Sequence, residues 1–322
     1  MQTASHIVVF DNNAYGDLLS GRLQGDLNEC LRGLTADEAR AGVEARACPT
    51  VMAELIASWA DSSSPAHAPS AASIKALVRH CTGRSGALAM IADEQSIACN
   101  AIFGTVPPLL DGNNRRLAGL CRSIAAGRTL TPSEMENVKA LRARVEAQER
   151  GFVDSMKQVQ RDLGGYDYNQ AERKKAFDDY TKSSEWSLAY GQMALDRCID
   201  ASGQSVDAAR RDEAVKALLG MSKATLALWI EFFENLLVNG AKPDRRKREN
   251  LIWDCQILTA AENLLVDGVP ILLVTSDRAM IRAAGSAQRA HACMSYGDYR
   301  DWLLRRMAAE QQHAADGASY RS

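Results

Sequence analysis

The sequence predicts an α/β fold in which a central parallel sheet is flanked by helices and carries a large, mainly α-helical insertion. Residues 7–10 and 270–275 are short, almost unbroken apolar runs, which are typical of strands buried on both faces of a parallel sheet. Helical patterns follow the first run and precede the second, and this order favours parallel strands joined by right-handed crossovers. The long stretch between the two ends of the chain has helical periodicity almost throughout.

The first part of the predicted core is residues 1–60. It begins with a strand at residues 6–10 and ends with a helix at residues 50–59, for which Thr50 is the expected N-cap. Residues 61–72 are rich in Ser, Pro and Ala, which predicts a flexible loop or a domain boundary.

Residues 61–244 form the predicted helical insertion. A helix is expected to start near Pro132 and to end before Gly164. Apolar residues at steps of three, four or seven then predict one long helix that packs in the core or against a partner helix: Val215, Leu219, Leu226, Trp229, Phe233 and Leu236. The insertion is a candidate lid, a substrate-selecting arm, or a surface for a homo-oligomer or a regulatory protein.

Residues 245–312 form the second part of the predicted core. The expected elements are, in order, a helix through residue 265, a strand at 270–275, a helix at 279–284, a strand at 292–295 and a helix at 299–309. Residues 313–322 are expected to be a disordered tail.

The composition is that of a folded globular protein. Of the 322 residues, 46% are apolar and 24% are charged, which excludes bulk disorder. Lys and Arg number 38 and Asp and Glu number 40, so the net charge is −2. This balance excludes a nucleic-acid binder that depends on bulk positive charge, although a local basic patch is compatible with it.

Cysteine usage and hydropathy favour a cytoplasmic protein without membrane contacts. The eight cysteines include no Cys-x-x-Cys pair, which is typical of reduced, buried thiols and does not indicate zinc. The first apolar run is shorter than a secretory signal core of about 7–15 residues. The most apolar long segment, residues 217–238, contains Lys223, Glu231 and Glu234, so it is a poor membrane span.

Four carboxylates stand where a functional crevice is expected. Asp11 and Asp277 follow the two predicted buried strands, and crevices in open parallel sheets lie beyond the carboxyl ends of the strands. Glu54 and Asp254 lie within apolar helical patterns, where an unpaired carboxylate is costly. Carboxylates gathered in one crevice repel each other, and a hard divalent cation such as Mg²⁺ or Mn²⁺ would relieve this repulsion.

Each acid also has a purely structural interpretation. Asp11 and Asp277 could serve only as N-caps of the helices that follow them. Glu54 could pair with an arginine, and Asp254 could complement the dipole of its own helix. The four together, with two at buried strand ends, favour a functional site.

In these segments the chain resembles the PIN-domain family of metal-dependent nucleases. The matching pieces are I-V-V-F-D-N-N at residues 7–13, the stretch 49–56, the helix around Asp254, and P-I-L-L-V-T-S-D at residues 270–277. Together they cover roughly residues 5–58 and 247–300. The sequence departs from the family at two positions: Asn12 stands where Thr or Ser is commoner, and Ser276 stands where Asn is commoner. It also departs in the roughly 200 residues that separate Glu54 from Asp254.

The resemblance implies a PIN-like parallel sheet sandwiched by helices and hydrolysis of RNA that leaves a 5′-phosphate. It implies that an acidic quartet binds Mg²⁺ or Mn²⁺ and catalyses the reaction: Asp11, Glu54, Asp254 and Asp277. Asn13 matches a common polar partner of the first aspartate, and Thr275 matches the strand-end threonine that orients the site.

A basic run directly precedes the Asp254 helix. It consists of Arg245, Arg246, Lys247 and Arg248. Four consecutive cations beside an acidic site could hold the phosphates of RNA, whereas a solvated surface run is the alternative.

The sequence therefore predicts a metal-dependent endoribonuclease that acts as a toxin, a defence effector or a processing enzyme. One alternative is a non-catalytic PIN-like protein that binds RNA or serves as a scaffold. Another is a phosphatase with an aspartyl nucleophile, which also begins with a strand and an Asp. That phosphatase class needs a second aspartate at position 13, where this chain has Asn13.

Overall fold

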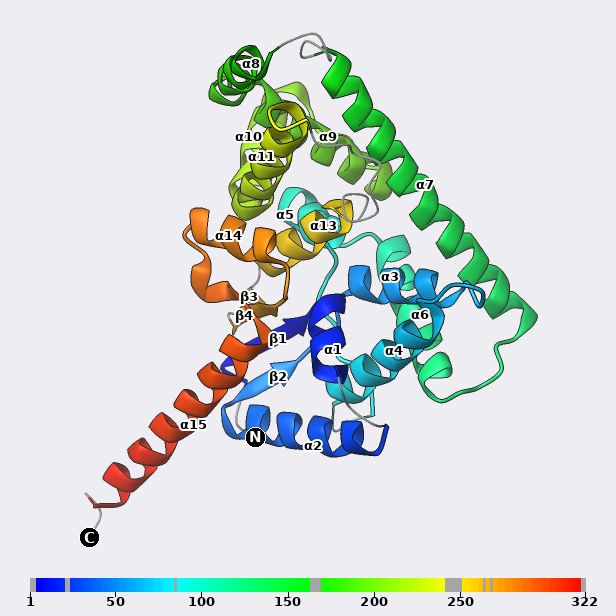
Figure 1. The fold of residues 1–322 in the computed structure, drawn as a ribbon, viewed down its shortest axis with the longest axis vertical. Helices are drawn as coiled ribbons and strands as arrows, with labels where there is room; N and C mark the ends of the chain where they lie inside the picture. The colour runs from blue at the N-terminus through cyan, green and yellow to red at the C-terminus, as the bar shows by residue number, and fades with distance from the viewer. Residues whose placement is uncertain are drawn as a thin grey trace.

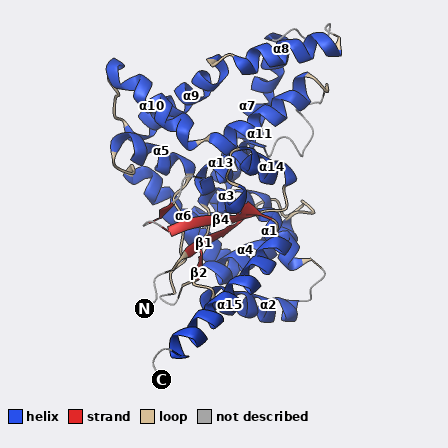
Figure 2. Ribbon diagram, turned by 90° about the vertical axis from the view of Figure 1, so that its left-hand side faces the viewer, coloured by secondary structure: helices blue, strands red, loops and turns tan. Residues whose placement is uncertain are grey.

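The computed structural model describes residues 4–20, 24–83, 86–162, 169–240, 251–262, 265–266 and 269–319. Most of these residues are helical, and a small sheet lies between layers of helices, which confirms an α/β fold (Figure 1). Figure 2 shows the strands at mid-height, with helices above and below them.

Four parallel strands form the sheet in the order β2 (Val43–Ala45), β1 (His6–Phe10), β4 (Val269–Val274) and β5 (Cys293–Met294). The two-residue strand β3 (Leu265–Val266) pairs antiparallel with the start of β4. Strands β1 and β4 are central and almost entirely buried, as their apolar sequences predict. Phe10 lies opposite Val274, so both strands end at the same edge of the sheet.

Helices from both ends of the chain cover the sheet. They are α1 (Asn12–Leu19), α2 (Gln24–Arg40), α3 (Pro49–Trp59), α4 (His67–Cys81), α13 (Leu251–Glu262), α14 (Arg278–Ser286) and α15 (Tyr296–Ser319), with the 3-10 turn η2 (Ala290–Ala292) before β5. Helix α15 continues through residues 313–319, a stretch for which the sequence predicts a disordered tail. None of the described helices combines the length and apolarity that crossing a bilayer requires.

The segment between α4 and α13 is helical, as expected, and most of it shares the core of the sheet. Its helices are α5 (Glu94–Phe103), α6 (Pro108–Ala125), α7 (Pro132–Asp162), α8 (Gln170–Lys182), α9 (Glu185–Ser202), α10 (Ala208–Met221) and α11 (Lys223–Leu237). Side chains of α6, α7 and α11, such as Leu117, Val138 and Leu228, belong to the same apolar cluster as β1 and β4. Helices α5, α9 and α10 share a second, smaller cluster.

Two sequence predictions in this region are wrong. The apolar stripe from Val215 to Leu236 is not one helix, because the chain turns at Ser222 between α10 and α11. Val215 faces the smaller cluster, whereas Leu236 faces the main core, so the regular spacing serves two different surfaces. Helix α4 begins at His67, inside the stretch predicted as a loop, because Ala and Ser residues there are compatible with a helix.

The predicted N-cap of α3 is also wrong. Pro49 is the first residue of the helix and Cys48 is the N-cap, without a side-chain hydrogen bond. Proline is well suited to the first helical position because its missing N–H would have no partner there. Thr50 is therefore inside the first turn, where it is buried.

A buried polar network holds α1, α2, α4 and α15 together on one side of the sheet. The Glu38 carboxylate accepts a hydrogen bond from the Tyr299 hydroxyl at 2.8 Å, and both its oxygens lie 3.0 Å from His80 Nε2. The other ring nitrogen of His80 is hydrogen-bonded to the Tyr15 hydroxyl at 3.3 Å. Because all four side chains are buried, losing any partner would leave a polar group unsatisfied in the core.

Candidate functional site

Two aspartates and a threonine lie where β1 and β4 end. Asp11 directly follows β1, and its backbone N–H donates to the Val274 carbonyl at 3.0 Å. Thr275 directly follows β4 and is fully buried. The pairing of β1 with β4 therefore places the residues after both strands side by side, as the parallel sheet predicts.

The Asp11 carboxylate is held by donors on several sides. It accepts hydrogen bonds from the Ala14 backbone N–H at 2.7 Å, from the Thr275 hydroxyl and from the Asn13 side chain. Only 2% of Asp11 is exposed to solvent. Burial raises the pKa of Asp11 to about 6, and the negative charge of Asp277 contributes to this rise. The hydrogen bonds from Thr275, Ala14 and Asn13 act in the opposite direction and lower the pKa.

Asp277 is the N-cap of α14 and lies close to Asp11. Its Oδ1 accepts hydrogen bonds from the backbone N–H groups of Ala279 at 2.6 Å and Met280 at 3.2 Å. The Asp277 backbone N–H donates to the Thr275 hydroxyl at 3.0 Å, and that hydroxyl donates to Asp11. One threonine thus orients both aspartates. Asp11 and Asp277 are the N-caps of α1 and α14, as the structural interpretation of each acid predicted. Both caps lie at the same edge of the sheet, where β1 and β4 end.

Asp254 projects from α13 toward this edge. Burial raises the pKa of Asp254 to about 8, and the negative charges of Asp277 and Asp11 add to the rise. Helix α13 packs against both β4 and α3, which explains how a residue far along the chain approaches the end of β1.

Glu54 completes the predicted quartet from α3. Burial raises the pKa of Glu54 well above its usual range, and the charges of Asp254, Asp11 and Glu149 raise it further. Every charge that influences Glu54 among the described residues is negative, so the pairing with an arginine considered from the sequence is not observed there. The charges of Asp11 and Asp254 thus disfavour ionisation of Glu54, and the charges of Asp11 and Asp277 disfavour ionisation of Asp254.

Glu149 of α7 is a fifth carboxylate, which the sequence reasoning did not single out. Its Oε1 accepts a hydrogen bond from the Trp253 indole N–H at 3.0 Å, and its charge acts on Glu54. A signal was available, because Glu149 continues the helical spacing of buried residues such as Val145 and Phe152. We name Asp11, Glu54, Glu149, Asp254 and Asp277 the acidic cluster.

The acidic cluster matches Mg²⁺ or Mn²⁺ in the chemistry of its donors, since hard cations prefer carboxylate oxygens. In the described residues, however, no three such side chains converge closely enough to hold an ion as they stand. Asp11 and Asp277 each direct oxygens to backbone N–H groups, which limits how many oxygens face the others. The residues thus fit a divalent ion in kind, whereas a closed coordination cage would need side chains to turn.

One positive charge near Asp277 comes from α14. Arg282 forms an ion pair with Glu231 of α11, and the charge of Asp277 also acts on it. The predicted phosphate-binding run, Arg245 to Arg248, lies outside the described residues, so its position relative to the acids stays a prediction.

The acidic cluster is an uncommon arrangement for a stable core, because like charges and burial both oppose ionisation. Such strongly perturbed carboxylates at a sheet edge are typical of functional sites. Comparisons with family models, with curated proteins and with solved structures find no match for this chain.

Proposed function

We propose that this chain is a Mg²⁺- or Mn²⁺-dependent endoribonuclease with a PIN-like core, which hydrolyses RNA and leaves a 5′-phosphate. The observation that carries the proposal is the acidic cluster, in which carboxylates from five segments between residues 11 and 277 act electrostatically on one another. The order of these acids along the chain matches the family pattern. RNA as substrate and a cytoplasmic location belong to the same proposal.

The protein groups have distinct roles in this proposal. Asp11, Asp254 and Asp277 would hold the ion, and Glu54 would hold a second ion or orient the attacking water. The ion would lower the pKa of water and neutralise charge on the phosphate. Thr275 keeps Asp11 in place through its hydroxyl, while the N-terminus of α14 orients Asp277.

The raised pKa values give the site a defined pH dependence. Asp254, with a pKa of about 8, is largely protonated at neutral pH, so a cation must displace a proton to bind there. Asp11, with a pKa of about 6, is already mostly ionised at that pH. We therefore expect metal affinity and cleavage to increase from pH 6 to pH 8.

RNA cleavage by single-substitution variants tests the proposal. Purified wild-type protein, Asp11→Asn and Asp277→Asn are incubated with total RNA and 5 mM Mg²⁺ or Mn²⁺, on the order of a saturating concentration. Each variant should cleave at least about 100-fold more slowly than wild type, because each removes a carboxylate that holds the ion. Asp212→Asn, an exposed acid on α10, is the matched control and should cleave normally.

Far-ultraviolet circular dichroism must show that each variant is folded. Undiminished Mn²⁺-dependent cleavage by folded Asp11→Asn would refute the proposed role of the acidic cluster. Equal cleavage by wild type and both variants would refute it in the same way, because neither carboxylate would then be needed for the activity.

Glu149 offers a second, more graded test. Its carboxylate lies beside Glu54 and is held by Trp253, so it supports the site from the insertion. Glu149→Gln should raise the Mn²⁺ concentration for half-maximal cleavage by about 3- to 10-fold, as changes beside metal ligands commonly do. An unchanged Mn²⁺ requirement would show that α7 has no part in the site.

A non-catalytic RNA-binding or scaffold protein is the second candidate. It is favoured by one observation, that in the part of the chain described no three acids converge as a ready-made ion site. Isothermal titration with Mn²⁺ at pH 8 separates the two candidates. Binding that disappears in Asp277→Asn supports the nuclease, whereas the absence of binding supports the scaffold.

A further inference from the structure

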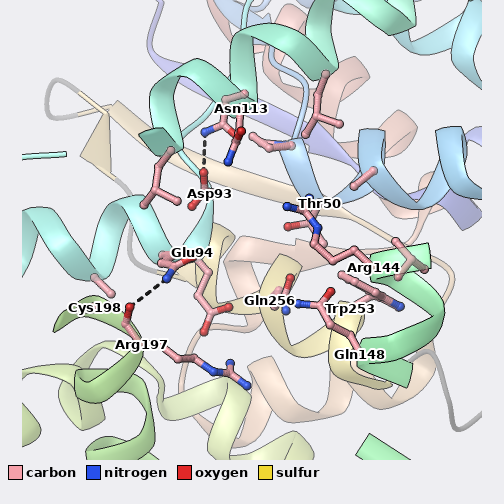
Figure 3. Close-up of a pocket in the computed structure, with 18 of the residues that line it drawn as sticks. Thr50, Asp93, Glu94, Asn113, Arg144, Gln148, Arg197, Cys198, Trp253 and Gln256 are labelled. Atoms are coloured by element: carbon pink, nitrogen blue, oxygen red, sulfur yellow. Dashed lines mark hydrogen bonds between the residues drawn. The ribbon is translucent and has the colours of Figure 1, made fainter. Parts of the chain in front are cut away.

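A cavity of about 410 Å³ lies between the sheet-covering helices and the insertion. Its walls come from α3, α5, α6, α7, α9 and α13 (Figure 3). The volume is within the range of small-molecule sites, which is about 300–1,000 Å³. It is well above what a single inorganic anion needs.

The cavity adjoins the acidic cluster. Three helices contribute to both, and in each of them a cavity-lining residue immediately precedes an acid of the cluster: Ala53 before Glu54, Gln148 before Glu149, and Trp253 before Asp254. The hydrogen bond from the Trp253 indole to Glu149 joins the cavity wall to the cluster. The cavity and the acidic cluster therefore share three helices and the contact between Trp253 and Glu149.

Two arginines enter the cavity from opposite sides. Figure 3 shows Arg197 on the same side as Glu94, and Arg144 across the cavity beside Gln148 and Trp253. Both arginines are exposed, and neither forms an ion pair with a described carboxylate within 4.0 Å. The charge of Arg197 acts on Glu94, which lines the same cavity, and both guanidinium groups have donors that suit a phosphate.

The remaining polar lining consists mainly of amide side chains, the Thr50 hydroxyl and the carboxylates of Asp93 and Glu94. Asn113, Gln148 and Gln256 all face the cavity, and among the described residues none of them has a hydrogen-bonding partner. Asn114, in contrast, donates to Asp93, which caps α5. Each free amide offers both a donor and an acceptor, which is the combination that the edge of a nucleobase requires.

We propose that this cavity holds one nucleotide unit of the RNA strand next to the bond that is cleaved. Arg144 and Arg197 bind the phosphate, and the amides of Asn113, Gln148 and Gln256 bind the base edge. This inference rests on the proposed nuclease function and adds to it a site that selects the nucleotide beside the cut. Cations alone would suit any anion, whereas the unpartnered amides distinguish a nucleotide from inorganic phosphate.

Nucleotide binding without metal tests the inference directly. The full chain in EDTA is titrated calorimetrically with the 5′-monophosphates of adenosine, guanosine, cytidine and uridine, and with inorganic phosphate. At least one nucleotide should bind at least about tenfold more tightly than phosphate, because it also engages the amides. Arg144→Gln and Arg197→Gln should each weaken that binding by about 5- to 20-fold. Arg210→Gln, an exposed arginine of α10, is the matched control and should have no effect.

Two further variants sharpen the result. Gln256→Ala should reduce the difference in affinity among the four nucleotides, because it removes a base contact. In cleavage assays, Arg144→Gln and Arg197→Gln should raise KM while kcat stays within about twofold. Asp277→Asn should bind nucleotide like wild type although it does not cleave.

Three outcomes would overturn the inference. No nucleotide binds more tightly than phosphate, or the arginine variants bind as wild type does, or the four nucleotides bind equally in both wild type and Gln256→Ala. If wild type cleaves RNA while binding no nucleotide, the cavity assignment alone fails. If it binds nucleotides but cleaves no RNA, the proposed function fails and the substrate role of the cavity fails with it.

Discussion

Replacing Asp254 with asparagine should stabilise the metal-free protein at pH 8 and have little effect near pH 4. Burial, together with the charges of Asp277 and Asp11, raises the pKa of Asp254 to about 8. An aspartate in an unfolded chain has a pKa of about 3.9. Between these values the folded state retains a proton that the unfolded state has lost, so wild-type stability falls as pH rises through this range. Asparagine cannot ionise and avoids this loss.

The magnitude follows from the width of that pH window. Each pH unit changes the free energy of unfolding by at most about 1.4 kcal/mol, and the window covers about four units. Water reaches the partly exposed Asp254 side chain and screens its neighbours, so we expect a smaller net difference of about 2–3 kcal/mol. The stability of Asp254→Asn relative to wild type should increase by that amount from pH 4 to pH 8.

Urea unfolding in EDTA at pH 4, 5, 6, 7 and 8 (about one-unit steps across the window) measures this difference. Asp212→Asn on α10 is the control, because it removes an exposed acid outside the cluster and should run parallel to wild type. A difference between Asp254→Asn and wild type that does not change with pH would refute the reasoning. It would show that Asp254 does not ionise against the charges of Asp11 and Asp277.

Three further predictions concern the metal, the core and the insertion. Mn²⁺ at about 100 times its Kd should stabilise the folded wild-type protein by about 2.7 kcal/mol. The rise in Tm should be larger at pH 8 than at pH 5.5, because protons compete with the metal for the carboxylates. Asp277→Asn should lose most of this rise in Tm, and an identical rise in both proteins would contradict the proposed metal site. Glu38→Leu should lower the free energy of unfolding, measured in urea, by about 3 kcal/mol, because His80 loses its buried hydrogen-bond acceptor. A decrease below about 1 kcal/mol would contradict the stabilising role of this buried polar network. Gly191→Val should lower Tm and reduce the free energy of unfolding by about 1–3 kcal/mol, because a Cβ at position 191 would lie 2.8 Å from Val215 Cγ1. An unchanged Tm would show that α9 and α10 can move apart to accommodate the larger side chain.

The sheet and its two strand-end acids were predictable because their causes are local. A strand buried on both faces needs a continuous apolar run, and β1 and β4 have one. Parallel strands end at a common edge, so Asp11 and Asp277 were expected to be neighbours. The proximity of Glu54 and Asp254 was expected from the resemblance to a family, and the packing of α13 on α3 provides the physical reason.

Other features depend on packing that no local pattern specifies. The turn at Ser222 leaves the apolar spacing of α10 and α11 almost continuous, so periodicity alone could not reveal it. Glu149 enters the acidic cluster only because α7 packs along α3 and Trp253 offers it an indole N–H. The polar cavity depends on six helices meeting at one place.

Local sequence was thus sufficient for β1, β4 and β5, for several of the helices and for the acids at the strand ends, since each of these depends on neighbouring residues, whereas it did not indicate β2 or β3. The side chains that share one electrostatic environment, and the cavity beside them, depended on how distant helices pack. Burial and mutual repulsion are properties of that packing, and they shift the pKa values of Asp11, Glu54 and Asp254 only once the chain has folded.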